Sequence, residues 1–132
     1  MINEKSAGCI IIDESKVLLV QQSSGNWGFP KGHLEKNETE IEAAIRETKE
    51  ETNLDVKIIE PNVRYSIEYD TEKGTHKEAV YFLASKISEN IVRQESEIGE
   101  IKWFSFEDAI KTISFENAKE LLKKVLSDLN LL

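Results

Sequence analysis

Short apolar runs separated by polar turns dominate the first quarter of the chain and predict strands. Residues 6–12 and 17–22 are two such runs, and the polar residues 13–16 between them predict a hairpin. A loop is predicted at residues 23–26, and a glycine loop from Gly32 to Glu38 leads into the next element.

A helix is predicted from Thr39 to Asn53. Thr39, with Glu42 three residues later, has the sequence of a capping box, and Asn53 tolerates the left-handed conformation of a C-terminal cap. At about 100° per residue, one mostly apolar face is expected to pack on a sheet. Its members are Ile41, Ala44, Ile45, Thr48 and Thr52. A neighbouring face carries four acids, with Arg46 at its edge: Glu40, Glu47, Glu50 and Glu51.

The rest of the chain is predicted to add strands and then two helices. The extended segments are 55–60, 63–69 (with Val63, Tyr65, Ile67 and Tyr69 on one face), 77–85 and 100–104, separated by a turn at 70–74 and a polar loop at 86–98. Ser105 and Ser114 are predicted N-caps of the two helices. The second helix carries an apolar stripe: Phe115, Ala118, Leu121, Leu122, Val125, Leu126 and Leu129. This order favours an α/β (α+β) fold, a mixed sheet with helices on both sides.

The acidic face of the first helix suggests a cation site. Glu47 lies three residues before Glu50 and four before Glu51, so the three carboxylates can converge on one point. Like charges at this spacing cost roughly 0.2–0.5 kcal/mol per pair on an isolated helix. The alternative is an ordinary solvated acidic face. Carboxylate oxygens with no Cys or His beside them suit Mg²⁺ or Mn²⁺ better than zinc.

Composition narrows the class of protein. With 132 residues, 39% hydrophobic and 32% charged, the chain is expected to form one domain over residues 1–132. Cys9 is the only cysteine and is expected in the core, and neither a signal peptide nor a membrane-spanning run is recognisable, so we expect a cytoplasmic protein. The net charge of −8 disfavours long nucleic acid and anionic membranes as partners, but a metal ion can bridge the acids to a small phosphorylated ligand.

Residues 32–54 resemble the Nudix box, G-x5-E-x7-R-E-U-x-E-E-x-G-U, where U is apolar. The matching positions are Gly32, Glu38, Arg46, Glu47, Glu50, Glu51 and Leu54. Two positions depart, because Thr48 replaces an apolar residue and Asn53 replaces the glycine. Asn is the non-glycine residue best suited to a left-handed cap, so we expect the turn to persist. The resemblance implies the Nudix α/β/α sandwich.

The resemblance also implies hydrolysis of a phosphoanhydride by metal-activated water. It assigns metal binding to Glu47, Glu50, Glu51 and the carbonyl of Gly32, and an orienting ion pair to Arg46. The general base stays open between Glu47 and Glu51. A further metal-binding acid is expected before the last strand, with Glu97 preferred over Glu95 and Glu100. A covalent mechanism has little support, since no nucleophile lies beside an evident histidine base.

Trp27 to His33, Trp-Gly-Phe-Pro-Lys-Gly-His, resembles the asymmetrically cleaving diadenosine tetraphosphate hydrolases, as do residues 77–84 and 97–103. Decapping and inositol-pyrophosphate enzymes carry a related motif. By this resemblance Lys31, His33 and Lys77 contact phosphates, and Tyr81 contacts phosphate or adenine. Lys77 and Tyr81 share a strand face ~13 Å apart. The alternatives are a core role for Tyr81, a plain loop position for His33 and a solvated position for Lys77.

The sequence therefore predicts a monomeric pyrophosphohydrolase that cleaves diadenosine tetraphosphate to ATP and AMP. The alternatives are another nucleoside diphosphate-linked substrate, such as ADP-ribose, an oxidised NTP or an RNA 5′ end, or a nucleotide sensor without catalytic activity.

Overall fold

The computed structural model describes residues 2–132, so Met1 of the predicted domain lies outside the described residues. The described elements follow the predicted order, with one short extra strand on either side of Phe29 and Pro30. They are β1 (Glu4–Asp13), β2 (Lys16–Gln22), β3 (Trp27–Gly28), β4 (Lys31–His33), α1 (Glu40–Thr52), β5 (Val56–Ile58), β6 (Tyr65–Asp70), β7 (His76–Lys86), β8 (Ile98–Ser105), α2 (Phe106–Thr112) and α3 (Glu116–Asp128).

The sheet is mixed and is organised around β1. The first part of β1 pairs in parallel with β7 and antiparallel with β4, and its end forms the predicted hairpin with β2. Strand β2 then pairs antiparallel with β3 and β8, while β7 pairs antiparallel with β5 and β6. The short β4 therefore lies beside the first half of β1, at residues 6–8, and away from the hairpin. This position becomes important for the site.

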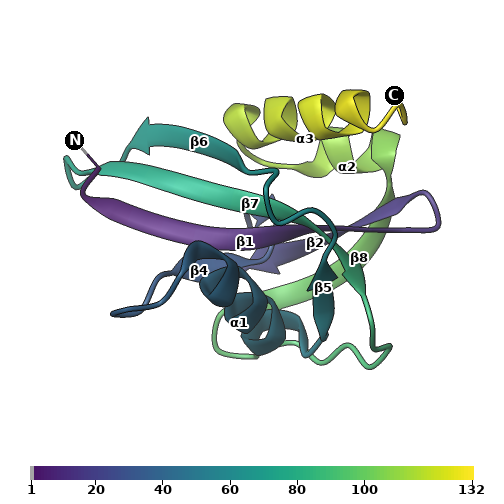
Figure 1. Cartoon of the computed structure of the whole chain (residues 1–132), viewed down its shortest axis with the longest axis horizontal. Coiled ribbons are helices and arrows are strands. Elements are labelled where there is room, and N and C mark those ends of the chain that lie inside the picture. The colour runs from purple at the N-terminus through teal and green to yellow at the C-terminus, as the bar shows by residue number, and fades with distance from the viewer. Residues whose placement is uncertain (1) are drawn as a thin grey trace.

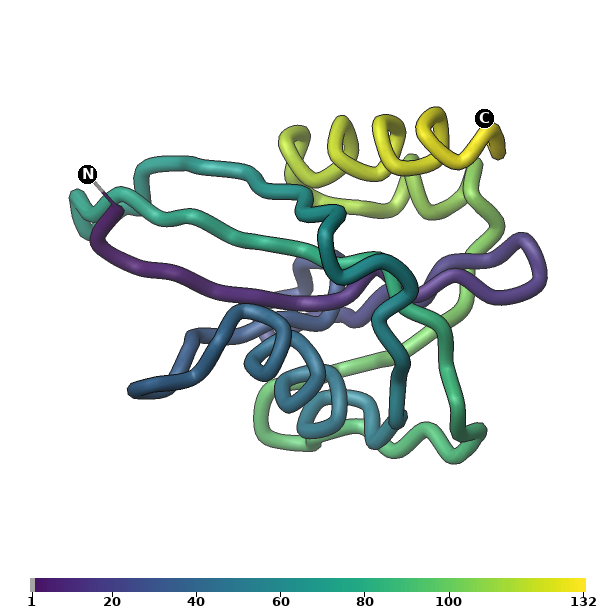
Figure 2. The backbone as a smooth tube through the Cα atoms, in the orientation of Figure 1, coloured from purple at the N-terminus to yellow at the C-terminus, as the bar shows by residue number. Residues whose placement is uncertain are grey.

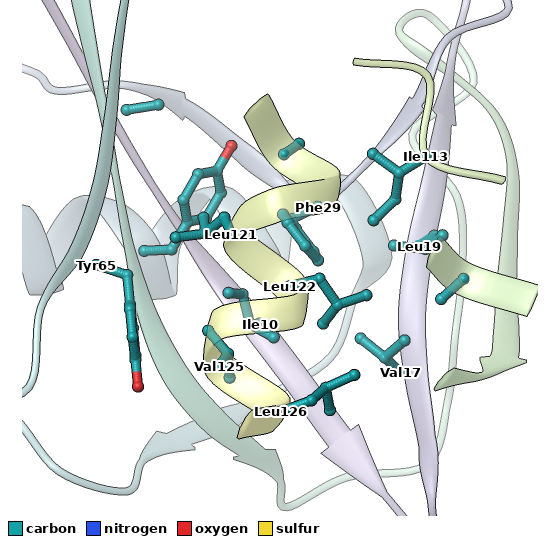
Figure 3. Close-up of a cluster of buried hydrophobic side chains, with 14 residues drawn as sticks. Ile10, Val17, Leu19, Phe29, Tyr65, Ile113, Leu121, Leu122, Val125 and Leu126 are labelled. Atoms are coloured by element: carbon teal, nitrogen blue, oxygen red, sulfur yellow. The ribbon is translucent and has the colours of Figure 1, made fainter. Parts of the chain in front are cut away.

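Helices cover both faces of the sheet, with α1 on one side and α2 and α3 on the other (Figure 1). Successive residues of β1 point to opposite faces, so Ile10 joins the α3 side while Cys9 and Ile11 join the α1 side. On the α3 side, Leu122 and Val125 pack in one cluster with Ile10 (Figure 3). The predicted α/β/α sandwich is confirmed, and Cys9 is buried in the core as expected.

Both predicted caps of α1 are confirmed, but the helix is rotated about its axis, so that a different face packs on the sheet from the one predicted. Thr39 Oγ1 accepts the Glu42 N–H at 3.1 Å, the Glu42 carboxylate accepts the Thr39 N–H at 2.9 Å, and Asn53 has φ 66°. The predicted core position of Ile45 is wrong, because this side chain is 37% exposed. Ala43 and Glu51 are buried instead. The small alanines at 43 and 44 permit close approach to the sheet, and of the four acids only Glu51 is turned inward and buried.

Three further expectations from the sequence are corrected. Ser105 caps α2, but Ser114 does not cap α3, because its Oγ accepts the Trp27 N–H at 2.8 Å and Phe115 occupies the N-cap position without a side-chain bond. Phe115 and Leu129 are exposed and not part of the core. Val63 is exposed in a turn before β6, where its N–H donates to Glu60 O.

The loop after β7 passes the C-terminal end of α1 (Figure 2) and is fastened to it. The Val92 N–H donates to Thr52 O at 3.0 Å, and the Gln94 N–H donates to Glu51 O at 3.3 Å. The side-chain amide of Asn53 adds a bond to Asn90 O at 2.9 Å. These bonds position the end of the loop, with Glu97, beside the acidic helix. No helix within residues 2–132 is both long and apolar enough to cross a membrane.

Candidate active site

A polar pocket of about 440 Å³ lies between α1, β4 and the end of the loop before β8. It brings together all the predicted site residues except Tyr81. These are Lys31, Gly32, His33, Arg46, Glu47, Glu50, Glu51, Lys77 and Glu97. Residues from four separate segments of the chain, 31–33, 46–51, 77 and 97, therefore line one pocket.

Arg46 connects the glycine loop to the acidic helix. Its Nε and one terminal nitrogen donate to the two oxygens of Glu38 at 2.7 and 2.9 Å, and the same terminal nitrogen donates to His33 O at 2.9 Å. Its other terminal nitrogen donates to Glu47 at 2.9 Å and to Glu50 at 3.1 Å. The bond to Glu38 is the main reason that the pKa of Arg46 is raised. Such a fork of planar donors fixes geometry in a way that lysine cannot.

Glu51 is the most deeply buried acid of the pocket, with 2% of its surface exposed. Burial, reinforced by the charge of Glu47, raises its pKa to about 8. Its Oε1 has no hydrogen-bond partner within residues 2–132. Burial also raises the pKa of Glu47 and lowers that of Lys31. A buried carboxylate oxygen without a partner is costly, so Glu51 is suited to a ligand that supplies one.

Gly32 lies in close contact with the Glu47 side chain of the helix. A Cβ at this position would overlap the Glu47 carboxylate. Since β4 pairs Gly32 with Ala7 of β1, the backbone there cannot easily move away. The glycine therefore leaves room for the Glu47 side chain beside the β4 backbone.

The acids line one pocket, but they do not converge on one point as predicted. Within the part of the chain that the structure describes, no three His, Cys, Asp or Glu side chains are arranged to hold a metal ion. Arg46 holds oxygens of both Glu47 and Glu50, which accounts for the difference. The donor set still fits a hard divalent cation, because it offers only carboxylate oxygens and Glu51 Oε1 is without a partner.

Tyr81 does not reach the polar pocket. It is 2% exposed, belongs to the α3-side core and packs edge-on against Phe29, with ring centroids 5.2 Å apart. It forms part of the wall of a second, mostly apolar pocket of about 690 Å³. The aromatic residues of this wall are Trp27, Phe29, Tyr69, Tyr81 and Phe115.

The two pockets adjoin, since Gln22 and Lys31 line both. Most of the aromatic wall and Gln22 were not predicted as site residues. For β6, the only sequence pattern that could have indicated a role in the pocket was the shared face of Tyr65, Ile67 and Tyr69. No sequence pattern indicates that Phe115 lies near residues 27–31.

The two remaining predicted contacts lie at the rim. His33 is exposed, with Nε2 3.2 Å from Glu4 Oε1, and Lys77 is the strand neighbour of Glu4 on β1 and of Tyr69 on β6. Burial lowers the pKa of Lys77. Both residues line the polar pocket, and their side chains carry nitrogen atoms that can donate to an anionic ligand.

Comparison with known proteins identifies the family of this chain. The NUDIX domain family matches residues 3–128. The chain belongs to the Nudix family. It is 35% identical over 128 residues to the asymmetrical bis(5′-nucleosyl)-tetraphosphatase of Caenorhabditis elegans, covering 91% of this chain and 92% of that protein. It also superimposes on a crystal structure of the C. elegans Ap4A hydrolase binary complex with TM-score 0.85 and 32% identity, covering 96% of this chain and 98% of the other.

A second group of relatives has a different activity. The mRNA-decapping enzyme subunit 2 of Saccharomyces cerevisiae is 37% identical over 121 residues, covering 87% of this chain but only 12% of that protein. The Nudix fold and hydrolase class are therefore shared with enzymes that act on different substrates.

Gly32→Ala in this Nudix hydrolase is expected to lower kcat by about 10- to 100-fold. The new methyl group would displace the Glu47 carboxylate. Misplacing a reacting group by ~1 Å can lower the rate by about 10²-fold. Steady-state kinetics measures the effect. Gly99→Ala is the control, since its Cβ would make only ordinary contacts. Equal activity of both variants would show that the contact between Gly32 and Glu47 is unimportant.

Glu97→Gln is expected to lower kcat/KM by at least 10-fold, because Glu97 alone of the three loop acids lines the pocket. Glu95→Gln and Glu100→Gln are expected to change it less than about 2-fold, as for substitutions away from a site. The same kinetic assay compares all three. A larger loss for Glu95 or Glu100 would assign the loop acid differently.

Proposed function

We propose that this Nudix hydrolase cleaves dinucleoside polyphosphates, with diadenosine tetraphosphate giving ATP and AMP, in the presence of Mg²⁺ or Mn²⁺. The observation that carries the proposal is the aromatic pocket joined to the carboxylate pocket at Lys31. A nucleobase stacks on aromatic rings, while a polyphosphate needs cations and metal-binding oxygens. The names of the C. elegans relatives support the same substrate.

In this proposal each side chain has a role that its position supports. Glu47, Glu50, Glu51 and Glu97, with the Gly32 carbonyl, would hold the divalent cation, which would neutralise phosphate charge and activate water. Arg46 holds Glu47 and Glu50 in place. Glu47 or Glu51 would take the proton from the attacking water as general base.

The substrate contacts follow from the same geometry. Lys31, His33 and Lys77 donate to phosphate oxygens at the polar pocket. The adenine lies in the aromatic pocket, where the ring of Tyr81 forms part of the wall. Tyr81 thus supports the base from the core side, and its hydroxyl is not required as a phosphate ligand.

A product assay over a panel of substrates tests the proposal. Diadenosine polyphosphates, ADP-ribose, NTPs and capped or triphosphorylated RNA are incubated with the enzyme and Mg²⁺, and products are separated by chromatography. Diadenosine tetraphosphate is expected to give ATP and AMP, and ¹⁸O-enriched water identifies the phosphorus attacked. Preferential release of the cap from RNA would instead favour the second candidate, to which the decapping relative points.

A further inference from the structure

The residues common to both pockets identify where a nucleotide passes from one to the other. Only Gln22 and Lys31 line the polar and the aromatic pocket alike, among the residues that the structure describes. A ligand with its phosphates in the first and its base in the second must place its ribose beside these two side chains. This step rests on the proposed function, because it requires a nucleoside polyphosphate as ligand.

Gln22 is held at this junction by its backbone. Its N–H donates to Asn26 O at 2.8 Å, and the next N–H, of Ser23, donates to Glu97 O at 2.9 Å. It pairs with Ile98 of β8, immediately after a register shift between Gln21 and Gln22. The extra residue is Gly99 of β8, so the bulge lies opposite Gln22, as bulges beside sites often do. Gln22 is therefore fixed next to Glu97, a predicted metal-binding acid.

The side chain of the adjacent Gln21 is bonded within its own loop and lies outside both pockets. The Gln21 side-chain amide donates to Gly25 O at 3.3 Å, and Gln21 lines neither pocket. Two residues of the same type thus lie side by side in β2. Gln21 is bonded within its own loop, and Gln22 lines both pockets. This pair provides a matched comparison within the chain.

Lys31 and Gln22 differ in their hydrogen-bonding groups, so they are suited to different parts of the ligand. An ammonium group only donates hydrogen bonds, so Lys31 matches ionised phosphate oxygens. A carboxamide both donates and accepts, as does a sugar hydroxyl. We propose that Gln22 hydrogen-bonds a ribose hydroxyl of the substrate and so favours nucleoside polyphosphates over inorganic polyphosphate.

The test compares binding by titration calorimetry of the whole chain with Mg²⁺ and three ligands: ADP, 2′,3′-dideoxy-ADP and inorganic tripolyphosphate. Gln22→Leu is expected to weaken ADP binding about 3- to 10-fold, the effect of one hydrogen bond between neutral groups. Wild type is expected to lose a similar factor on dideoxy-ADP. Gln22→Leu loses nothing further on dideoxy-ADP, because the same bond is already absent. Its tripolyphosphate binding is expected to equal that of wild type.

Gln21→Leu is the control and is expected to bind all three ligands as wild type does, with unchanged thermal stability in both variants. The inference is overturned if the loss from Gln22→Leu and the loss from removing the ribose hydroxyls multiply. It is also overturned if Gln22→Leu weakens tripolyphosphate binding as much as ADP binding, or if Gln21→Leu weakens ADP binding as Gln22→Leu does. Failure of the wild type to bind ADP would overturn it as well. Because the assay uses no dinucleoside polyphosphate, the proposed substrate and the role of Gln22 can fail separately.

Discussion

Replacing Glu51 with glutamine is expected to lower kcat by about 10³-fold at saturating substrate and Mg²⁺. Glutamine keeps the shape of the side chain but carries no negative charge and cannot accept a proton, and the loss of such a group typically costs 10²–10⁴-fold. Glu51 is chosen because it is buried and its Oε1 has no partner within residues 2–132. Steady-state kinetics over a range of Mg²⁺ concentrations measures the loss.

Glu95→Gln is the control, since this acid lies on the same loop as Glu97 but does not line the pocket. It is expected to retain full activity. Nucleotide binding by wild type and Glu51→Gln is measured in parallel. If both proteins bind nucleotide equally and neither turns it over, the catalytic role is wrong and the alternative of a sensor without activity applies.

The stability of the metal-free protein is expected to fall as the pH rises from about 4.5 to about 8. Glu51 has a pKa of about 8 when folded, against an ordinary value of 4.5. Between these values the folded state holds a proton that the unfolded state has lost, so raising the pH favours unfolding, and the slope disappears above about 8. The contribution of this group is on the order of a few kcal/mol.

Urea unfolding of wild type and Glu51→Gln across pH 4 to 9, in the presence of a chelator, measures this contribution. Glu51→Gln lacks the titrating group, so its stability is expected to depend less on pH and to exceed that of wild type above pH 8. Identical pH profiles for the two proteins would contradict a raised pKa for the buried Glu51 carboxyl.

The sequence predicted the helix of the site well because its determinants are local. The capping box at Thr39 and the cap at Asn53 depend on residues within a few positions of each other, and both formed as predicted. How far the helix rolls on the sheet is not a local property. Ile45 is exposed and Glu51 buried because of what packs against them, and the apolar pattern alone assigned Ile45 to the core.

The aromatic pocket depends even more on tertiary packing, which the sequence did not predict. Its wall combines Trp27 and Phe29 with Tyr69 of β6 and Phe115 before α3, and only the folded sheet brings these segments together. Tyr81 was assigned to the ligand by the family resemblance, with which its spacing to Lys77 agreed. Strand pairing places it across from Tyr65, in the core cluster on the α3 side. The polar pocket was easier to predict, because most of its residues lie in one continuous motif.

Asn53 stands where the family motif has glycine, and its amide group holds Asn90 O as well as allowing the left-handed turn. A glycine offers no such group. The substitution thus gives the segment that carries Glu97 a tether to the end of α1, in addition to the backbone bonds from Val92 and Gln94. Any motion that separates this segment from α1 must also break these hydrogen bonds at the end of the helix. The position of Glu97 is therefore coupled to that of the acids on α1.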